Sequence, residues 1–133
     1  MIFMRYLLDS DIVIDVLGKH GQSLQLLEEI AGDEIFLSVI GFSEVLYGIQ
    51  RGQRSAKDMD AMQNLVRDFH IQILSVTMQV VERYVELKVD LEKKGLKLAD
   101  FDLLIASTAR EHKLILVTRN KRHFSRIPNL KLL

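Results

Sequence analysis

The chain has 133 residues, no cysteine, and 18 basic side chains against 18 acidic ones, so its formal net charge is zero. The absence of cysteine excludes a disulfide scaffold, a cysteine-based zinc site and a thiol nucleophile, and it suits a cytoplasmic protein. Hydrophobic residues make up 48% of the chain, but no apolar run reaches the roughly 20 residues that a membrane helix needs. We therefore expect a single cytoplasmic domain over residues 1–133, without a secretory signal or a membrane segment.

The apolar pattern predicts short strands that alternate with helices. Strands are expected at Tyr6–Leu8, Glu34–Ile40, Ile71–Val76 and Leu114–Val117, with a last edge strand at Leu130–Leu133. Helices are expected after Asp9, over Gln22–Ala31, from Phe42 to a stop at Gly52, over Met59–Phe69, after an N-cap at Thr77, and from Asp102 to Ala109. The apolar side of the helix after Thr77 is predicted to hold Val80, Val81, Tyr84, Val85, Leu87 and Leu91.

This order of elements predicts an α/β fold. Strands separated by helices pair in parallel, and right-handed crossovers place the helices on both faces of the sheet. The apolar runs of the strands are continuous rather than alternating, as expected for strands buried on both sides.

Several polar residues are predicted to follow strands or to begin helices. Asp9 comes directly after the first strand, Glu44 falls in the first turn after the second, Asp102 precedes an apolar helix, and Asn120 follows the last long strand. In a parallel α/β sheet the carboxyl ends of the strands meet at one edge, where ligands bind. Oxygen ligands without cysteine or clustered histidine favour Mg²⁺ or Mn²⁺. Considered singly, Asp9 and Asp102 also suit helix N-caps, and Glu44 suits the first turn of a helix.

The charge is unevenly distributed along the chain. Residues 1–66 hold 5 basic and 10 acidic side chains, whereas residues 67–133 hold 13 basic and 8 acidic ones. A basic strip beside an acidic site is compatible with an enzyme that acts on a phosphate polyanion, although such lysines and arginines are also ordinary surface residues.

Four segments of the chain resemble the PIN-domain ribonucleases, and more narrowly the VapC-type toxins of toxin–antitoxin modules. They are LLDSDIVIDVL (Leu7–Leu17), SVIGFSEVLYGI (Ser38–Ile49), ADFDLLIASTAREH (Ala99–His112) and LILVTRNKRHFSRIPNLKL (Leu114–Leu132). The resemblance spans nearly the whole chain and implies a three-layer α/β/α sandwich with a central parallel sheet. It also implies an endoribonuclease that uses Mg²⁺, with Mn²⁺ as a substitute, to hydrolyse RNA phosphodiester bonds with an activated water.

The resemblance also assigns roles to individual residues. Asp9, Glu44 and Asp102 match the family's metal-binding and catalytic acids, and Asn120 stands where many members carry a fourth acid. Thr118 matches a small hydroxyl residue near the site. Asp100 is expected to be a supporting acid near the site, and Arg119, with Lys121 or Arg122, is expected to contact RNA phosphates.

The partners implied by the resemblance are an RNA substrate, a second copy of the chain in a homodimer, and a cognate VapB-type antitoxin. The apolar stripes at Phe42–Ile49 and Met59–Phe69 are candidates for a groove that holds an antitoxin helix, but such stripes usually face the protein's own core.

Three other classes are compatible with parts of the sequence. A phospho-receiver signalling domain would use Asp9 and Asp11 for a metal, but it needs a phosphoacceptor aspartate where this chain has Glu44. A dehalogenase-like phosphatase would use the same two acids, yet a helix after Asp9 is expected to point Asp11 away from it. A catalytically inactive PIN-fold binding protein is the third.

Overall fold

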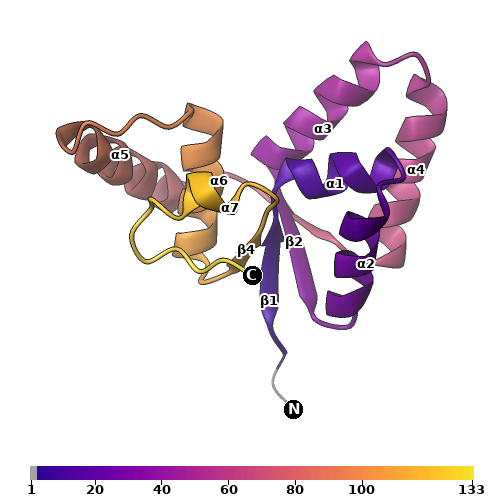
Figure 1. Cartoon of the computed structure of the whole chain (residues 1–133), viewed down its shortest axis with the longest axis horizontal. Helices are drawn as coiled ribbons and strands as arrows, with labels where there is room; N and C mark the ends of the chain where they lie inside the picture. Colours follow the sequence, from indigo (N-terminus) through magenta and orange to yellow (C-terminus); the bar gives the residue numbers. More distant parts are fainter. Residues whose placement is uncertain (1–2) are drawn as a thin grey trace.

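The computed structural model describes residues 3–133 and places a sheet between two groups of helices (Figure 1). In chain order the elements are β1 (Arg5–Leu8), α1 (Ser10–Leu17), α2 (Gly21–Ile30), β2 (Glu34–Ser38), α3 (Val39–Arg51), α4 (Ser55–Asp68), β3 (Gln72–Leu74), α5 (Met78–Lys93), α6 (Asp100–Glu111), β4 (Ile115–Val117) and α7 (Lys121–Phe124). Helices α1 to α4 lie on one side of the sheet and α5 to α7 on the other. The predicted α/β/α sandwich is confirmed.

The sheet is parallel throughout, with the strand order β3-β2-β1-β4. β1 lies between β2 and β4. Its pairing with β2 runs from Arg5 opposite Glu34 to Leu8 opposite Leu37. Its pairing with β4 runs from Tyr6 opposite Ile115 to Leu8 opposite Val117. The chain leaves β1 towards β2 and later returns to the opposite side of β1 as β4, so the strand order reverses at β1. Open α/β sheets bind ligands at such a reversal, beyond the carboxyl ends of the strands.

Alternate side chains of each strand enter two separate cores. In β1, Tyr6 and Leu8 pack among α1 to α4, whereas Leu7 packs among α5 to α7. In β2, Leu37 packs among α1 to α4, and Phe36 packs among α5 to α7. Because successive side chains of a strand point to opposite faces, a strand covered on both sides must be apolar at every position. This explains the continuous apolar runs of the sequence.

The boundary between β2 and α3 differs from the prediction. Ser38 is the N-cap of α3, and its Oγ accepts a hydrogen bond from the backbone N–H of Gly41 at 3.0 Å. The strand therefore ends at Ser38 instead of Ile40, and Glu44 lies in the second turn of the helix instead of the first. The predicted stop at Gly52 and the predicted N-cap at Thr77 are confirmed.

The start of α6 and the chain's tail also differ from the prediction. α6 begins at Asp100, with Ala99 as its N-cap, so Asp102 lies in the first turn and neither starts nor caps the helix. The tail makes a single residue pair with the sheet, between Leu132 and Leu116, and is not a full edge strand.

The apolar side predicted for α5 is only partly buried. Val80, Leu87 and Leu91 are in the core, whereas Val81 and Val85 are exposed. Within residues 3–133 every helix is too short or too polar to span a membrane.

Candidate active site

The edge formed by the carboxyl ends of β1 and β4 positions Asp9. Its backbone N–H donates to the Val117 carbonyl at 2.8 Å, which extends the β1–β4 pairing by one residue. Asp9 is also the N-cap of α1, and one carboxylate oxygen accepts the backbone N–H of Ser10 at 2.8 Å. Its other oxygen accepts the hydroxyl of Thr118 at 2.7 Å. Asp9 therefore caps α1, the alternative considered from the sequence, and also lies at the sheet edge.

Ser10 connects Asp9 to Glu44. Its backbone N–H donates to the Asp9 carboxylate, and its buried hydroxyl donates to Glu44 Oε1 at 2.9 Å. Glu44 reaches this position from the second turn of α3, because α3 starts directly at the end of β2. The sequence does not single out Ser10, since its role depends on the packing of α3 against α1.

Asp102 comes from the opposite layer of the sandwich, on α6. His123 of α7 lies 2.9 Å from Asp102 Oδ2 through its Nε2, and its ring packs edge-on against Phe124 with centroids 5.2 Å apart. In the tautomer that carries a proton on Nε2, His123 donates to the carboxylate and fixes its orientation.

Burial and the charges of nearby acids raise the pKa values of Asp9 and Glu44. Burial, followed by the charge of Asp11, raises the pKa of Asp9 to about 7, with a smaller contribution from Asp102. Burial also raises the pKa of Glu44, and the charges of Asp102 and Asp11 add to this shift. The charge of Asp102 on α6 thus adds to the raised pKa of both Asp9, the N-cap of α1, and Glu44 on α3, and an added cation would offset this repulsion.

Asp11 lies beside the predicted site residues, although the sequence assigned it a role only in the receiver and phosphatase alternatives. Instead of pointing away from Asp9, Asp11 approaches the same Thr118 hydroxyl, at 3.3 Å, and its Oδ2 accepts the backbone N–H of Arg119 at 3.0 Å. Burial raises the pKa of Asp11, and its buried Oδ1 has no hydrogen-bond partner within residues 3–133. An unpaired buried carboxylate oxygen is costly unless a cation or a proton accompanies it.

The remaining predicted site residues are divided between the sheet edge and the surface. Thr118 is buried beside Asp9, and its Oγ1 accepts the backbone N–H of Asn120 at 3.0 Å. The side chain of Asn120 is exposed at the start of α7. Asp100 turns away from the acids and binds the Tyr84 hydroxyl and the Lys88 ammonium of α5, each at 2.8 Å. Arg119 is an ion-pair partner of Asp15.

The chemistry of these residues suits a hard divalent cation. The available donors are carboxylate oxygens from Asp9, Glu44 and Asp102, with Asp11 behind them, and no thiolate is present in the sequence. As the side chains stand, no three His, Asp or Glu groups among residues 3–133 are close enough together to form a metal site. Mg²⁺ commonly uses one or two protein carboxylates and retains several waters, so a closed protein cage is not required.

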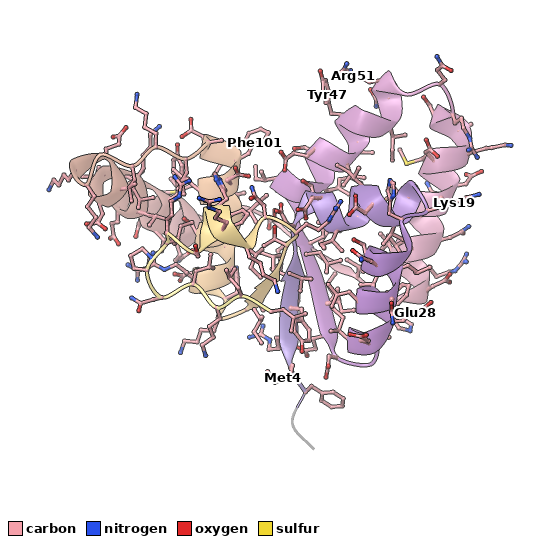
Figure 2. The ribbon with its side chains drawn as sticks, in the orientation of Figure 1. Met4, Lys19, Glu28, Tyr47, Arg51 and Phe101 are labelled. Carbon is pink, nitrogen blue, oxygen red and sulfur yellow. The ribbon has the colours of Figure 1, made fainter. Side chains whose placement is uncertain are left out.

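A groove adjoins the acids. It has a volume of about 770 Å³ and is lined by Ser10, Ile14, Ser43, Glu44, Tyr47, Gly48, Arg51, Gly52 and Phe101. Figure 2 shows Tyr47 and Arg51 near the end of α3, across from Phe101 on α6. Tyr47 is 63% exposed, and the Arg51 guanidinium lies 5.3 Å from its ring centre. The stripes at Phe42–Ile49 and Met59–Phe69 face the core, the alternative that the sequence favoured over an antitoxin groove, since Val45, Ile49, Met62 and Leu65 are buried.

Comparison with known proteins identifies the class. The family model described as "PIN domain" matches residues 6–130, and the chain belongs to the PIN-domain family. This membership sets aside the receiver and phosphatase classes.

Within that family, relatives named VapC match nearly the whole chain, which confirms the predicted resemblance. Ribonuclease VapC2 of Rickettsia felis is 33% identical over 131 residues, which cover 96% of this chain and 95% of that protein. The tRNA(fMet)-specific endonuclease VapC of Shigella flexneri is 23% identical over 96% of each chain. The crystal structure of VapBC2 from Rickettsia felis, bound to a promoter DNA fragment, matches with a TM-score of 0.89 and 32% identity over 98% of each chain.

Proposed function

We propose that this chain is a VapC-type endoribonuclease that depends on Mg²⁺, or on Mn²⁺ in its place. The observation that carries the proposal is that Ser10 joins Asp9 and Glu44 by hydrogen bonds at the sheet edge, while the charge of Asp102 adds to the raised pKa of both acids. The similarity of 33% over almost the full length to a protein named ribonuclease VapC2 supports it.

In this proposal Asp9, Glu44 and Asp102 hold the ion, and Asn120, whose backbone N–H donates to Thr118, contributes an amide oxygen. The ion, when bound, polarises the phosphodiester and lowers the pKa of the attacking water. Ser10 and Thr118 orient the carboxylates of Glu44 and Asp9 by donating hydrogen bonds to them. One of the carboxylates accepts the proton of the water.

An RNA cleavage assay tests the proposal. The purified chain is expected to cut RNA with Mg²⁺ or Mn²⁺ and to stop when the ion is chelated. Asp9→Asn and Asp102→Asn are each expected to abolish cleavage while the fold is retained, because each removes a metal ligand. Initiator tRNA belongs in the substrate panel because the relative from Shigella flexneri is named for it.

Asp100→Asn is the matched control, because Asp100 is an exposed acid on the same helix as Asp102. Its carboxylate contacts Tyr84 and Lys88 of α5 instead of the other acids. It should leave cleavage within about twofold of the parent, as expected for an exposed ion pair. Cleavage that continues in excess chelator, or parental activity of Asp9→Asn, contradicts the proposal. A folded chain that cuts no RNA with any ion supports the alternative of an inactive binding protein.

The proposed partner is a VapB-type antitoxin. The matched Rickettsia felis structure is a VapBC2 complex, which supports such a partner for this chain. The groove between α3 and α6 is a suitable surface, because exposed aromatic rings and Arg51 line it next to Glu44. We also propose a homodimer, supported by the exposed apolar side chains of α5.

A further inference from the structure

The buried acid Asp15 has no part in the proposed reaction. It lies on α1 and is only 8% exposed, and its Oδ2 accepts the Ser23 hydroxyl at 3.0 Å and the Arg119 guanidinium at 2.6 Å. A carboxylate buried to this degree is stable in its charged form only when it is paired. Arg119 is therefore the charge partner that Asp15 needs, although the two residues are 104 positions apart in the sequence.

Arg119 is held at a second point by the same helix. Its backbone N–H donates to Asp11 Oδ2 at 3.0 Å, while its guanidinium binds Asp15. Asp11 and Asp15 are four residues apart on α1, so their side chains lie on the same face of the helix. One turn of α1 thus fixes both the backbone and the side chain of Arg119.

The segment that Arg119 belongs to also orients the candidate metal ligands. Thr118 donates its hydroxyl to Asp9 at 2.7 Å and accepts the backbone N–H of Asn120 at 3.0 Å. Any displacement of residues 118–120 would move the hydroxyl that holds Asp9 and would move Asn120 with it. The Asp15–Arg119 pair lies outside the set of candidate ligands but is attached to the segment that contains Asn120 and hydrogen-bonds Asp9.

We infer that Asp15 and Arg119 form a positioning pair that fixes residues 118–120 against α1 and thereby sets the geometry of the metal site. This assigns Arg119 a different role from the RNA contact expected from the sequence. The inference rests on the proposed function, because it assumes that Asp9 binds a divalent ion.

The test measures Mn²⁺ binding by electron paramagnetic resonance, on the full chain without RNA. Asp15→Asn and Arg119→Gln are each expected to weaken Mn²⁺ binding about tenfold, the usual effect of removing a group that orients a ligand. The double variant should be no weaker than either single one, because both remove the same interaction. Arg119→Lys, which keeps the charge, should recover part of the loss.

Arg5→Gln is the matched control. Arg5 pairs with Glu34 at 2.9 Å at the opposite end of the sheet, so this variant removes an arginine–acid pair far from the acids. It should bind Mn²⁺ like the parent. A similar loss of Mn²⁺ affinity in Arg5→Gln would show a general effect of stability and would overturn the inference.

Hydrogen exchange provides a second measurement that does not depend on the metal. The amides of Arg119 and Asn120 should exchange faster in Asp15→Asn, while those of Leu7 and Leu8 in β1 should be unchanged. Unchanged protection of residues 118–120 would overturn the inference. So would an Arg119→Gln variant that binds Mn²⁺ normally but needs more RNA for half-maximal cleavage, since that result indicates an RNA contact. If the parent binds no Mn²⁺, the proposed function fails, while hydrogen exchange still decides whether the pair fixes the segment.

Discussion

At the scale of single residues, the hydrogen bonds of the Asp9 carboxylate and its burial have opposite effects on its pKa. Its carboxylate caps α1 and accepts the Thr118 hydroxyl, both of which favour the charged form. Burial and the nearby Asp11 outweigh these hydrogen bonds and raise its pKa from 3.8 to about 7. The folded protein therefore retains a cost that a bound cation would remove, as is common where function requires clustered charge.

This cost predicts a pH-dependent effect of Asp9→Asn in metal-free protein. Because the pKa of Asp9 is raised in the folded state, its stabilising contribution is complete below about pH 4 and is lost as the pH rises through 7. Asp9→Asn should therefore raise the free energy of unfolding at pH 8 by about 2 kcal/mol more than at pH 5. Urea unfolding in chelator measures the difference.

Asp100→Asn provides the comparison for this experiment. The hydrogen bond from Lys88, followed by that from Tyr84, lowers the pKa of Asp100, so this acid stabilises the fold above its ordinary pKa. Its removal should give no gain at pH 8. If Asp9→Asn and Asp100→Asn changed the free energy of unfolding equally at both pH values, Asp9 would carry no electrostatic cost in the folded protein.

The contrast between Asp100 and Asp102 also shows what the sequence could predict about the site. The two acids are two positions apart on α6, about 200° around a helix, so they point in nearly opposite directions. The approach of Asp11 to Arg119 depends on β1 and β4 being neighbours, and the residues are 108 positions apart. A sequence pattern predicts that strand ends gather at one edge, but it does not predict the strand order that brings particular residues together.

At the scale of elements, α5 presents an unusual exposed face. Met78, Val81, Val85 and Val89 are exposed and recur every three or four residues, so they form one stripe along the helix. The sequence predicted a broad apolar side, but the core takes only the part that includes Val80, Leu87 and Leu91. Hydrophobic periodicity alone does not distinguish a core face from a face available to a second copy of the chain.

The proposed homodimer makes this stripe testable. Val85→Lys should convert a dimer to a monomer, because it places a charge at the centre of the stripe. Light scattering after size-exclusion chromatography measures the mass, and circular dichroism confirms the fold. Gln79→Lys adds the same charge to an exposed position on another side of α5 and should leave the dimer intact. A parent chain that is monomeric, or a Val85→Lys variant that remains dimeric, contradicts the use of this stripe.

The element boundaries illustrate a related limit of sequence patterns. The caps at Thr77 and Gly52 are predicted because a polar or small residue directly flanks an apolar helix. The start of α3 was predicted too late, because Val39 and Ile40 suit a strand as well as a helix and the cap at Ser38 decides between them. The three-residue shift of the helix start, from Phe42 to Val39, moves Glu44 from the first to the second turn.

At the scale of the whole molecule, the sheet joins two cores and the site draws on both. Asp9 caps α1 and Glu44 lies on α3, in the layer of α1 to α4, whereas Asp102 and His123 lie on α6 and α7 in the opposite layer (Figure 1). The edge of β1 and β4 is where the two layers meet around the acids. A single cation held between them would connect the layers, and we propose that these carboxylates share one ion.

Anomalous diffraction from crystals of the full chain soaked in Mn²⁺ tests this claim most directly. We predict one strong manganese peak at the sheet edge, coordinated by carboxylate oxygens of Asp9, Asp102 and Glu44, directly or through water. The peak should disappear in Asp9→Asn crystals treated in the same way. A manganese peak only elsewhere on the surface, or no peak at this edge although crystal packing leaves the acids accessible, would contradict an ion shared by these carboxylates.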